Sequence, residues 1–174
     1  VVASSAAHAG TVQFEGVDIA PSPAAIHQNQ FKVVYTDTLA GPFGYSIEAN
    51  ATQSANTKAV KSDQLLEKFN VTIPMGFLTS TSRVIYGQNG YTTKYDTIWG
   101  VEEKVTSKTP IQNLTVSAGY RYLDGVSVAG EMRKRIEASS EYALTKKYSV
   151  GVVYYNTTGN TKNDQIGGYL KIKF

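Results

Sequence analysis

The sequence predicts an all-β fold: an antiparallel, up-and-down transmembrane β-barrel of about ten strands, with eight strands as the smaller alternative. Three observations lead to this prediction. Apolar residues recur at every second position through most of the chain, the connections alternate between short and longer, and the last segment keeps the same alternation up to Phe174. A period of two belongs to strands with unlike faces, and alternating hairpin lengths are typical of barrels that cross a membrane.

Composition excludes several other classes of protein. The chain has 174 residues, enough for one domain with a core. Its 17 Lys and Arg oppose 14 Asp and Glu without any block of like charge, so nothing indicates a nucleic-acid partner. The lack of cysteine excludes disulfides and thiolate metal sites. No apolar run approaches the roughly 20 residues of a membrane-spanning helix, and a mean hydropathy of −0.24 is compatible with strands that expose every second side chain to lipid.

The domain organisation is simple. Residues 1–9 resemble the end of a secretory signal peptide, with an A-x-A site at Ala7-His8-Ala9, and residues 10–174 form a single barrel domain. The expected strands are Thr11–Ala20, Phe31–Leu39, Tyr45–Ser54, Leu65–Met75, Ser82–Tyr91, Tyr95–Ser107, Leu114–Leu123, Gly130–Leu144, Tyr148–Thr157 and Gln165–Phe174.

The connections between these strands fall into two sets. Short ones such as "AGPFG" (40–44) and "TKK" (145–147) follow even-numbered strands, whereas "QSANTKAVKSDQ" (53–64) and "NTTGNTKND" (156–164) follow odd-numbered ones. Transmembrane barrels have short periplasmic turns and longer outer loops. We therefore expect the short turns and both chain ends on the periplasmic side.

Each strand has an apolar and a polar face. In Gly130–Leu144 the apolar face carries Met132, Ile136, Ala138, Tyr142 and Leu144, and the other face carries Arg133, Arg135, Glu137, Ser139 and Glu141. Two charges interrupt apolar faces: Lys134, which can extend toward lipid head groups, and Glu67, which we expect near one end of its strand.

Two architectures share this alternation, because a soluble β-sandwich and a membrane barrel are both half-buried sheets. Apolar-face aromatics near strand ends favour the barrel, since such rings lie at head-group level. The ring expected on the side of the short turns is Tyr45, Tyr142, Tyr148 and Phe174. The ring expected on the side of the longer loops is Phe31, Tyr91, Tyr95, Tyr120 or Tyr122, and Tyr154. The apolar faces also contain few bulky residues, whereas a sandwich core needs interdigitating ones. A secreted β-sandwich, such as a fimbrial subunit or adhesin, is the alternative.

The last strand resembles the assembly signal of Gram-negative outer-membrane β-barrel proteins. The matching residues are Phe174, Ile172, Leu170 and the pair Gly167-Gly168, although these glycines lie slightly further from the Phe than in the commonest pattern. The resemblance implies an outer-membrane location, contact with outer-membrane lipid, and recognition of this strand by the barrel-assembly machinery. It indicates a superfamily and no particular member, and it leaves the oligomeric state open.

The polar faces would line the lumen of such a barrel. The predicted lumen residues are Lys32, Glu48, Lys68, Glu102, Lys104, Arg121, Arg133, Arg135, Glu137, Glu141, Lys171 and Lys173. Because buried charges must pair or be hydrated, this set predicts either a plugged structural barrel or a narrow porin-like channel that favours small anionic solutes. Small monomeric porins for acidic oligosaccharides are similar in style, with Arg and Lys along the lumen.

No catalytic constellation emerges from the sequence, and we expect no enzyme, cofactor or metal. A lipid-modifying barrel would have to use His27, Ser22 and an acid such as Asp124 at the outer rim. A single loop histidine is more often a solvated surface residue, and no Asp, Glu and His cluster has the spacing of a metal site.

Overall fold

A computed structural model describes residues 10–21, 28–54, 60–91, 94–125, 133–159 and 163–174. They form ten strands: β1 (Thr11–Pro21), β2 (Gln28–Ala40), β3 (Phe43–Ser54), β4 (Val60–Met75), β5 (Leu78–Tyr91), β6 (Lys94–Lys108), β7 (Leu114–Gly125), β8 (Arg133–Ala143), β9 (Tyr148–Gly159) and β10 (Asn163–Lys173). None of the residues described forms a helix long and apolar enough to span a membrane.

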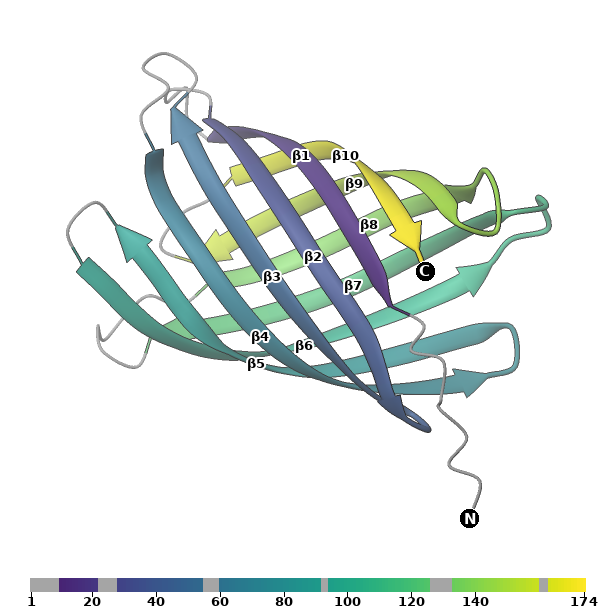
Figure 1. The fold of residues 1–174 in the computed structure, drawn as a ribbon. Helices are drawn as coiled ribbons and strands as arrows, with labels where there is room; N and C mark the ends of the chain where they lie inside the picture. The colour runs from purple at the N-terminus through teal and green to yellow at the C-terminus, as the bar shows by residue number, and fades with distance from the viewer. Residues whose placement is uncertain (1–9, 22–27, 55–59, 92–93, 126–132, 160–162) are drawn as a thin grey trace.

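The ten strands make one closed antiparallel barrel, in which each strand pairs with its sequence neighbours and β10 pairs with β1. Figure 1 shows the strands inclined to the barrel axis, as closure of a sheet requires. Closure removes the unpaired edges that an open sheet would expose. The predicted ten-strand barrel is confirmed, and the eight-strand and β-sandwich alternatives are wrong because a single sheet closes on itself.

The seam between the first and last strands is continuous. The register runs from the pair Thr11 and Lys173 to the pair Pro21 and Asn163. Beyond it, the backbone N–H of Phe174 donates to the carbonyl of Gly10 at 3.1 Å. Both ends of the barrel domain therefore lie together at one end of the barrel.

The connections after the even-numbered strands are short, as predicted, and lie at the same end as Gly10 and Phe174. Residues 41–42 join β2 to β3, and residues 76–77 join β4 to β5. Gly41 and Gly76 have φ values of 56° and 67°, a region that favours glycine. We call this end of the barrel the turn end. The connections after odd-numbered strands fall largely outside the described residues, although only two residues separate β5 from β6.

The barrel is inverted relative to a soluble protein. Its interior contains buried charged and polar side chains, and its outer surface exposes large apolar ones. Exposed examples are Phe14, Phe31, Phe69, Val84, Val101, Ile136, Val152 and Ile166. An apolar band of this extent needs an apolar solvent, and the acyl chains of a bilayer provide it.

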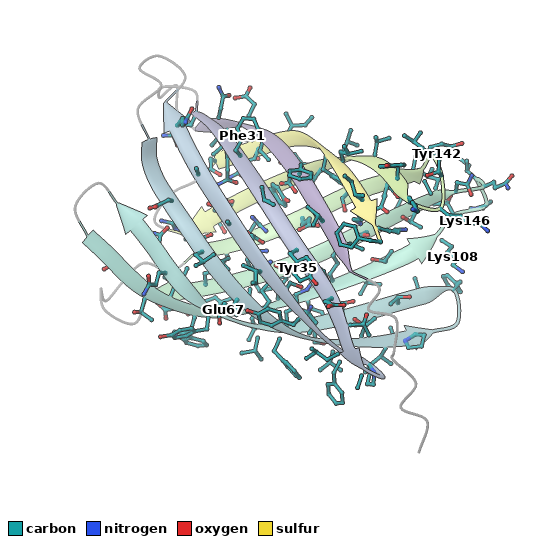
Figure 2. The ribbon with its side chains drawn as sticks, in the orientation of Figure 1. Phe31, Tyr35, Glu67, Lys108, Tyr142 and Lys146 are labelled. Atoms are coloured by element: carbon teal, nitrogen blue, oxygen red, sulfur yellow. The ribbon has the colours of Figure 1, made fainter. Side chains whose placement is uncertain are left out.

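Aromatic side chains lie toward both ends of this outer surface. In Figure 2, Tyr142 lies near the turn end beside Lys108 and Lys146, and Phe31 lies toward the opposite end. Tyr148 and Phe174 are exposed near the turn end, Tyr154 is exposed on β9, and Tyr45 is partly buried. The side chain of Tyr95 lies outside the described residues. That these rings form membrane girdles stays a prediction.

Several strands are longer than predicted. β4 begins at Val60 where the sequence suggested Leu65, and β5 begins at Leu78 where it suggested Ser82. The added segments "VKSDQ" (60–64) and "LTST" (78–81) contain few apolar residues, so no alternation marks them in the sequence. The longer β4 also corrects the position of Glu67, which lies in the middle of the strand on the exposed outer face, and not near one end.

Candidate functional site: the barrel interior

The barrel interior contains most of the predicted lumen residues. Those buried or partly buried around an interior cavity are Lys32, Glu48, Lys68, Glu102, Lys104, Arg121, Arg135, Glu137, Glu141 and Lys171. Arg133 is partly buried at the first position of β8, and Lys173 is exposed at the last position of β10. Three interior charges were missed by the sequence analysis: Glu15 on β1, Arg83 on β5 and Asp96 on β6. The alternation of Gln13, Glu15 and Val17 could have placed Glu15 there.

A central cluster of five charges joins five consecutive strands. It consists of Glu48, Lys68, Arg83, Glu102 and Arg121. Lys68 Nζ lies 2.5 Å from Glu48 Oε2 and 3.8 Å from Glu102 Oε2, and Arg83 Nη1 also pairs with Glu102. Charges removed from water in this way are stable only when their partners are well placed, so the cluster also holds its strands in register.

Arg121 is the centre of this cluster. Its Nη1 and Nη2 donate to the two carboxylate oxygens of Glu48 at 3.1 and 3.0 Å, and its Nε donates to Glu102. This is the planar, forked geometry in which guanidinium groups bind carboxylates most strongly.

A second group surrounds the ring of Tyr155. Lys32 Nζ lies 2.6 Å from Glu15 Oε1, and the Tyr155 hydroxyl donates to the same oxygen at 2.7 Å. Lys32 also donates to that hydroxyl at 2.7 Å. The Arg135 guanidinium carbon lies 4.1 Å from the ring centroid, within the range of a cation–π contact.

Two further ion pairs lie nearer water. Lys104 Nζ is 2.6 Å from Glu137 Oε1, and Lys171 pairs with Glu141. The side chains of Lys104 and Lys171 are 25% and 23% exposed, against 13% and 17% for their carboxylate partners. Because these side chains point into the barrel, the cations are the groups that lumen water meets first.

Apolar side chains also point into the barrel, which the sequence analysis did not anticipate. Two clusters form, and neither is accessible to solvent. One consists of Leu66, Ile85, Ile98 and Leu123, and the other of Val17, Ile19, Val153 and Tyr155. Ile19, Ile98 and Leu123 lie toward the end opposite the turn end. The same half of the interior also contains buried polar side chains, namely Thr52, Asn89, Asp96, Thr157 and Gln165. We call the two apolar clusters the apolar seal, after the role proposed for them below.

Glycines on neighbouring strands make room for this packing. Leu66 lies opposite Gly87 and Leu123 lies opposite Gly100 in the strand register. A Cβ at Gly87 would lie 2.9 Å from Leu66 Cδ2, and one at Gly100 would lie 2.7 Å from Leu123 Cδ2, closer than carbon atoms approach. Each leucine therefore fills the space that the opposite glycine leaves empty.

The other half of the lumen holds a polar cavity of about 410 Å³. Hydroxyl side chains line it toward the turn end, and they include Thr11, Thr36, Thr81, Thr106, Thr115 and Ser117. Thr11 is the first residue of β1 and Thr115 the second of β7, so the cavity extends to the turn end. The interior is thus asymmetric, with an apolar seal, a charged middle layer and a hydroxyl-lined vestibule.

The described residues offer little for catalysis. They contain no group of three or more His, Asp and Glu that could hold a metal ion. Asp124 accepts a hydrogen bond from the Tyr122 hydroxyl at 3.1 Å, and His27 and Ser22 lie outside the described residues. The lipid-modifying alternative therefore stays untested, because two of its three residues lie outside the described part of the chain.

Solved structures with a similar chain path are membrane barrels. The KdgM porin in complex with disordered oligogalacturonate is 9% identical, the match covering 94% of this chain and 99% of that chain, with a TM-score of 0.55. The NanC porin is 10% identical over 94% of this chain and 100% of that chain, with a TM-score of 0.53. The translocator domain of the autotransporter NalP from Neisseria meningitidis is 10% identical over 99% and 90%, with a TM-score of 0.51.

These likenesses concern the fold, because the identities are low. The chain shares the closed antiparallel barrel fold of these membrane proteins. The sequence matches no family model and no curated protein.

Proposed function

We propose that this barrel is a narrow, porin-like channel of low conductance that favours small anionic solutes. The observation that carries the proposal is the charge balance of the interior. Seven ion-paired cations (Lys32, Lys68, Arg83, Lys104, Arg121, Arg135 and Lys171) accompany five ion-paired carboxylates (Glu15, Glu48, Glu102, Glu137 and Glu141) and the buried Asp96 among the described residues.

The excess positive charge is also the charge nearest water. Arg83 is 20% exposed where its partner Glu102 is 5% exposed, and Lys104 and Lys171 follow the same trend. A low-dielectric wall around a cavity of one sign raises the local concentration of ions of opposite sign. Anions entering the vestibule are therefore favoured over cations.

The apolar clusters limit the flow. Leu66 is 0% exposed and Ile85 is 1% exposed. We propose that the two clusters narrow the lumen so far that a solute passes only when their side chains move apart. We propose that the channel opens in brief, small conductance steps and that the seal, not the charged layer, sets their frequency. A ten-stranded barrel has little room beyond its own side chains, which also limits conductance.

The same seal favours a second candidate function. If the apolar clusters never separate, the chain is a structural barrel whose charges serve only to hold the wall together. Its biological role would then depend on surfaces outside the lumen.

Single-channel recording in planar bilayers under a salt gradient separates the two candidates. A channel of the proposed kind gives discrete current steps and a reversal potential displaced toward the anion. Steps with cation preference would contradict the anionic role, and a silent membrane containing folded barrel would support the structural one. Folded barrel can be verified by its anomalous mobility on unboiled SDS gels.

We also propose how the barrel reaches its membrane. Phe174 follows β10, which forms the closing seam with β1, and the barrel-assembly machinery would recognise this strand. The turn end would then lie on the periplasmic side. Replacement of Phe174 by Ala should reduce the fraction of heat-modifiable barrel in the outer membrane, and Ile172→Ala should have a smaller effect.

A further inference from the structure

Arg135 is held differently from the other buried arginine. Arg121 makes hydrogen bonds to two carboxylates, whereas the one ion pair of Arg135 among the described residues is with Glu137 Oε2, 4.0 Å from Nη2. The Nε of Arg135 is buried and has no hydrogen-bond partner among the described residues. The guanidinium is instead positioned against the ring of Tyr155, with 4.1 Å between its carbon and the centroid.

This arrangement leaves donor capacity unused. A guanidinium carries five N–H donors in one plane, and a buried donor without a partner is costly. Because the contact with Tyr155 holds the guanidinium in place, its donors are positioned before any ligand arrives. A flexible ammonium group in the same place would not be oriented in this way.

The surroundings of Arg135 supply the rest of a binding site. Arg135 and Lys104 flank the same carboxylate, since Lys104 Nζ contacts Glu137 Oε1 at 2.6 Å and Arg135 lies on the side of Oε2. Both cations line the cavity of about 410 Å³, which is large enough for a small organic molecule. The hydroxyl side chains of the vestibule lead to them from the turn end.

We infer that Arg135, with Lys104 beside it, is a fixed binding site for a small carboxylate that enters through the turn end. A carboxylate is the anion that matches the planar fork of a guanidinium, and it would satisfy the donors that Glu137 reaches only at 4.0 Å. This inference deepens the proposed function by giving the anionic solute one resting place in the lumen. Binding itself requires no passage through the apolar seal.

The test uses the full chain folded in zwitterionic detergent micelles, with difluoroacetate as the probe and neutral difluoroacetamide as the matched control. Fluorine NMR line broadening reports binding. We expect saturable broadening of the difluoroacetate signal in excess of that of difluoroacetamide. In Arg135→Met the apparent affinity should fall at least about tenfold, as expected when a charged hydrogen-bonding partner is lost.

Two further variants keep the result interpretable. Arg135→Lys retains the charge but not the forked geometry, so its affinity for difluoroacetate should lie between those of the wild type and Arg135→Met. If Arg135→Met does not fold, the affinity of Arg135→Lys is the test of the inference. Lys134→Met removes one positive charge from the exposed outer face next to Arg135 in sequence and should leave binding unchanged. Equal broadening by acid and amide, or full binding by Arg135→Met or Arg135→Lys, would overturn the inference.

The outcome is separable from that of the channel proposal. Binding without current steps would leave the Arg135 site standing and reject the channel. Anion-selective current without specific binding of difluoroacetate would support the channel and reject the Arg135 site.

Discussion

Arg121 on β7 and Glu48 on β3 form a forked pair across the barrel interior, with both terminal nitrogens of the guanidinium donating to the carboxylate at 3.1 and 3.0 Å. The two residues are 73 positions apart in the chain. Their strands are not neighbours in the sheet, so this pair connects parts of the wall that share no backbone hydrogen bond.

Removal of Arg121 should therefore destabilise the whole barrel. In Arg121→Met, Glu48 keeps Lys68 and Glu102 keeps Arg83, but both carboxylates lose their guanidinium partner. Breaking a buried ion pair costs about 3–5 kcal/mol. Urea unfolding followed by the fluorescence of Trp99, the only tryptophan, measures the free energy of unfolding. The exposed Lys134→Met variant is the charge-matched control. A loss below about 1 kcal/mol, as for surface ion pairs, would mean that the interior is hydrated enough to replace the pair.

The two adjacent tyrosines Tyr154 and Tyr155 provide a comparison of the two faces of one strand. The Tyr155 hydroxyl is buried between Lys32 and Glu15, whereas that of Tyr154 is exposed and donates to Asp164 at 2.7 Å. Tyr155→Phe should lower the free energy of unfolding by about 1–3 kcal/mol, because two charged groups lose a partner. Tyr154→Phe should change it by less. Equal effects would show that the interior hydroxyl is replaced by water.

The apolar seal can be tested with two neighbouring leucines. Leu66 is fully buried inside the barrel, and Leu65 is 49% exposed on its outer face. Leu66→Ala should cost about 2–5 kcal/mol, as core truncations do, and should increase the frequency or size of current steps. Leu65→Ala should leave the current unchanged. An unaltered current in folded Leu66→Ala would place the barrier elsewhere in the lumen.

Charge reversal at the β8 side of the lumen should alter ion preference. In the double variant Arg133→Glu and Arg135→Glu, the reversal potential under a salt gradient should move toward cations, because two interior positive charges become negative. Lys134→Glu makes a similar change on the outer face and should have no such effect. A selectivity equal to that of the wild type would reject the pore role of these residues.

Glu67 should weaken the barrel in lipid. It lies mid-strand on the exposed face of β4, between Ile47 and Tyr86 in the register, with no ion pair or hydrogen bond among the described residues. Charged residues on a lipid face are destabilising, acids less than Arg or Lys, so Glu67→Leu should raise the free energy of unfolding by about 1 kcal/mol and Glu67→Gln by less. The measurement requires folding into lipid vesicles. A decrease in both variants would indicate that the carboxylate has a binding partner in the membrane.

The alternation of apolar residues was enough to predict the barrel, its outer face and most of its interior charges, because a strand's period of two assigns side chains to faces without reference to any other strand. The strand ends at Val60 and Leu78 were missed because "VKSDQ" (60–64) and "LTST" (78–81) contain few apolar residues to mark a strand. Arg83 was not predicted to line the lumen, because it lies next to Ser82, where the predicted strand begins and the alternation is short.

The apolar seal could not be read along a single strand. At Leu65 and Leu66 both faces of β4 are apolar, so the pattern there does not tell a lipid-facing side chain from an interior one. The decisive feature is the register, which sets Leu66 opposite Gly87 and Leu123 opposite Gly100. Pairing between strands is information that only the folded sheet supplies. The same limit applies to Arg121 and Glu48, whose contact spans the lumen.

Gly10 and Phe174 are in contact, and the sheet between them is closed, so the order of the strands in the chain could be changed without changing their pairing. A short peptide joining these residues would make the domain a covalent ring, and new ends could then be opened at Gly76, in a tight turn between β4 and β5. In such a circular permutant β10 is followed by β1 in the chain, while every pair in the sheet is retained. Its stability, once folded, would depend on the wall alone, and its yield in the membrane would depend on the order in which the strands are delivered.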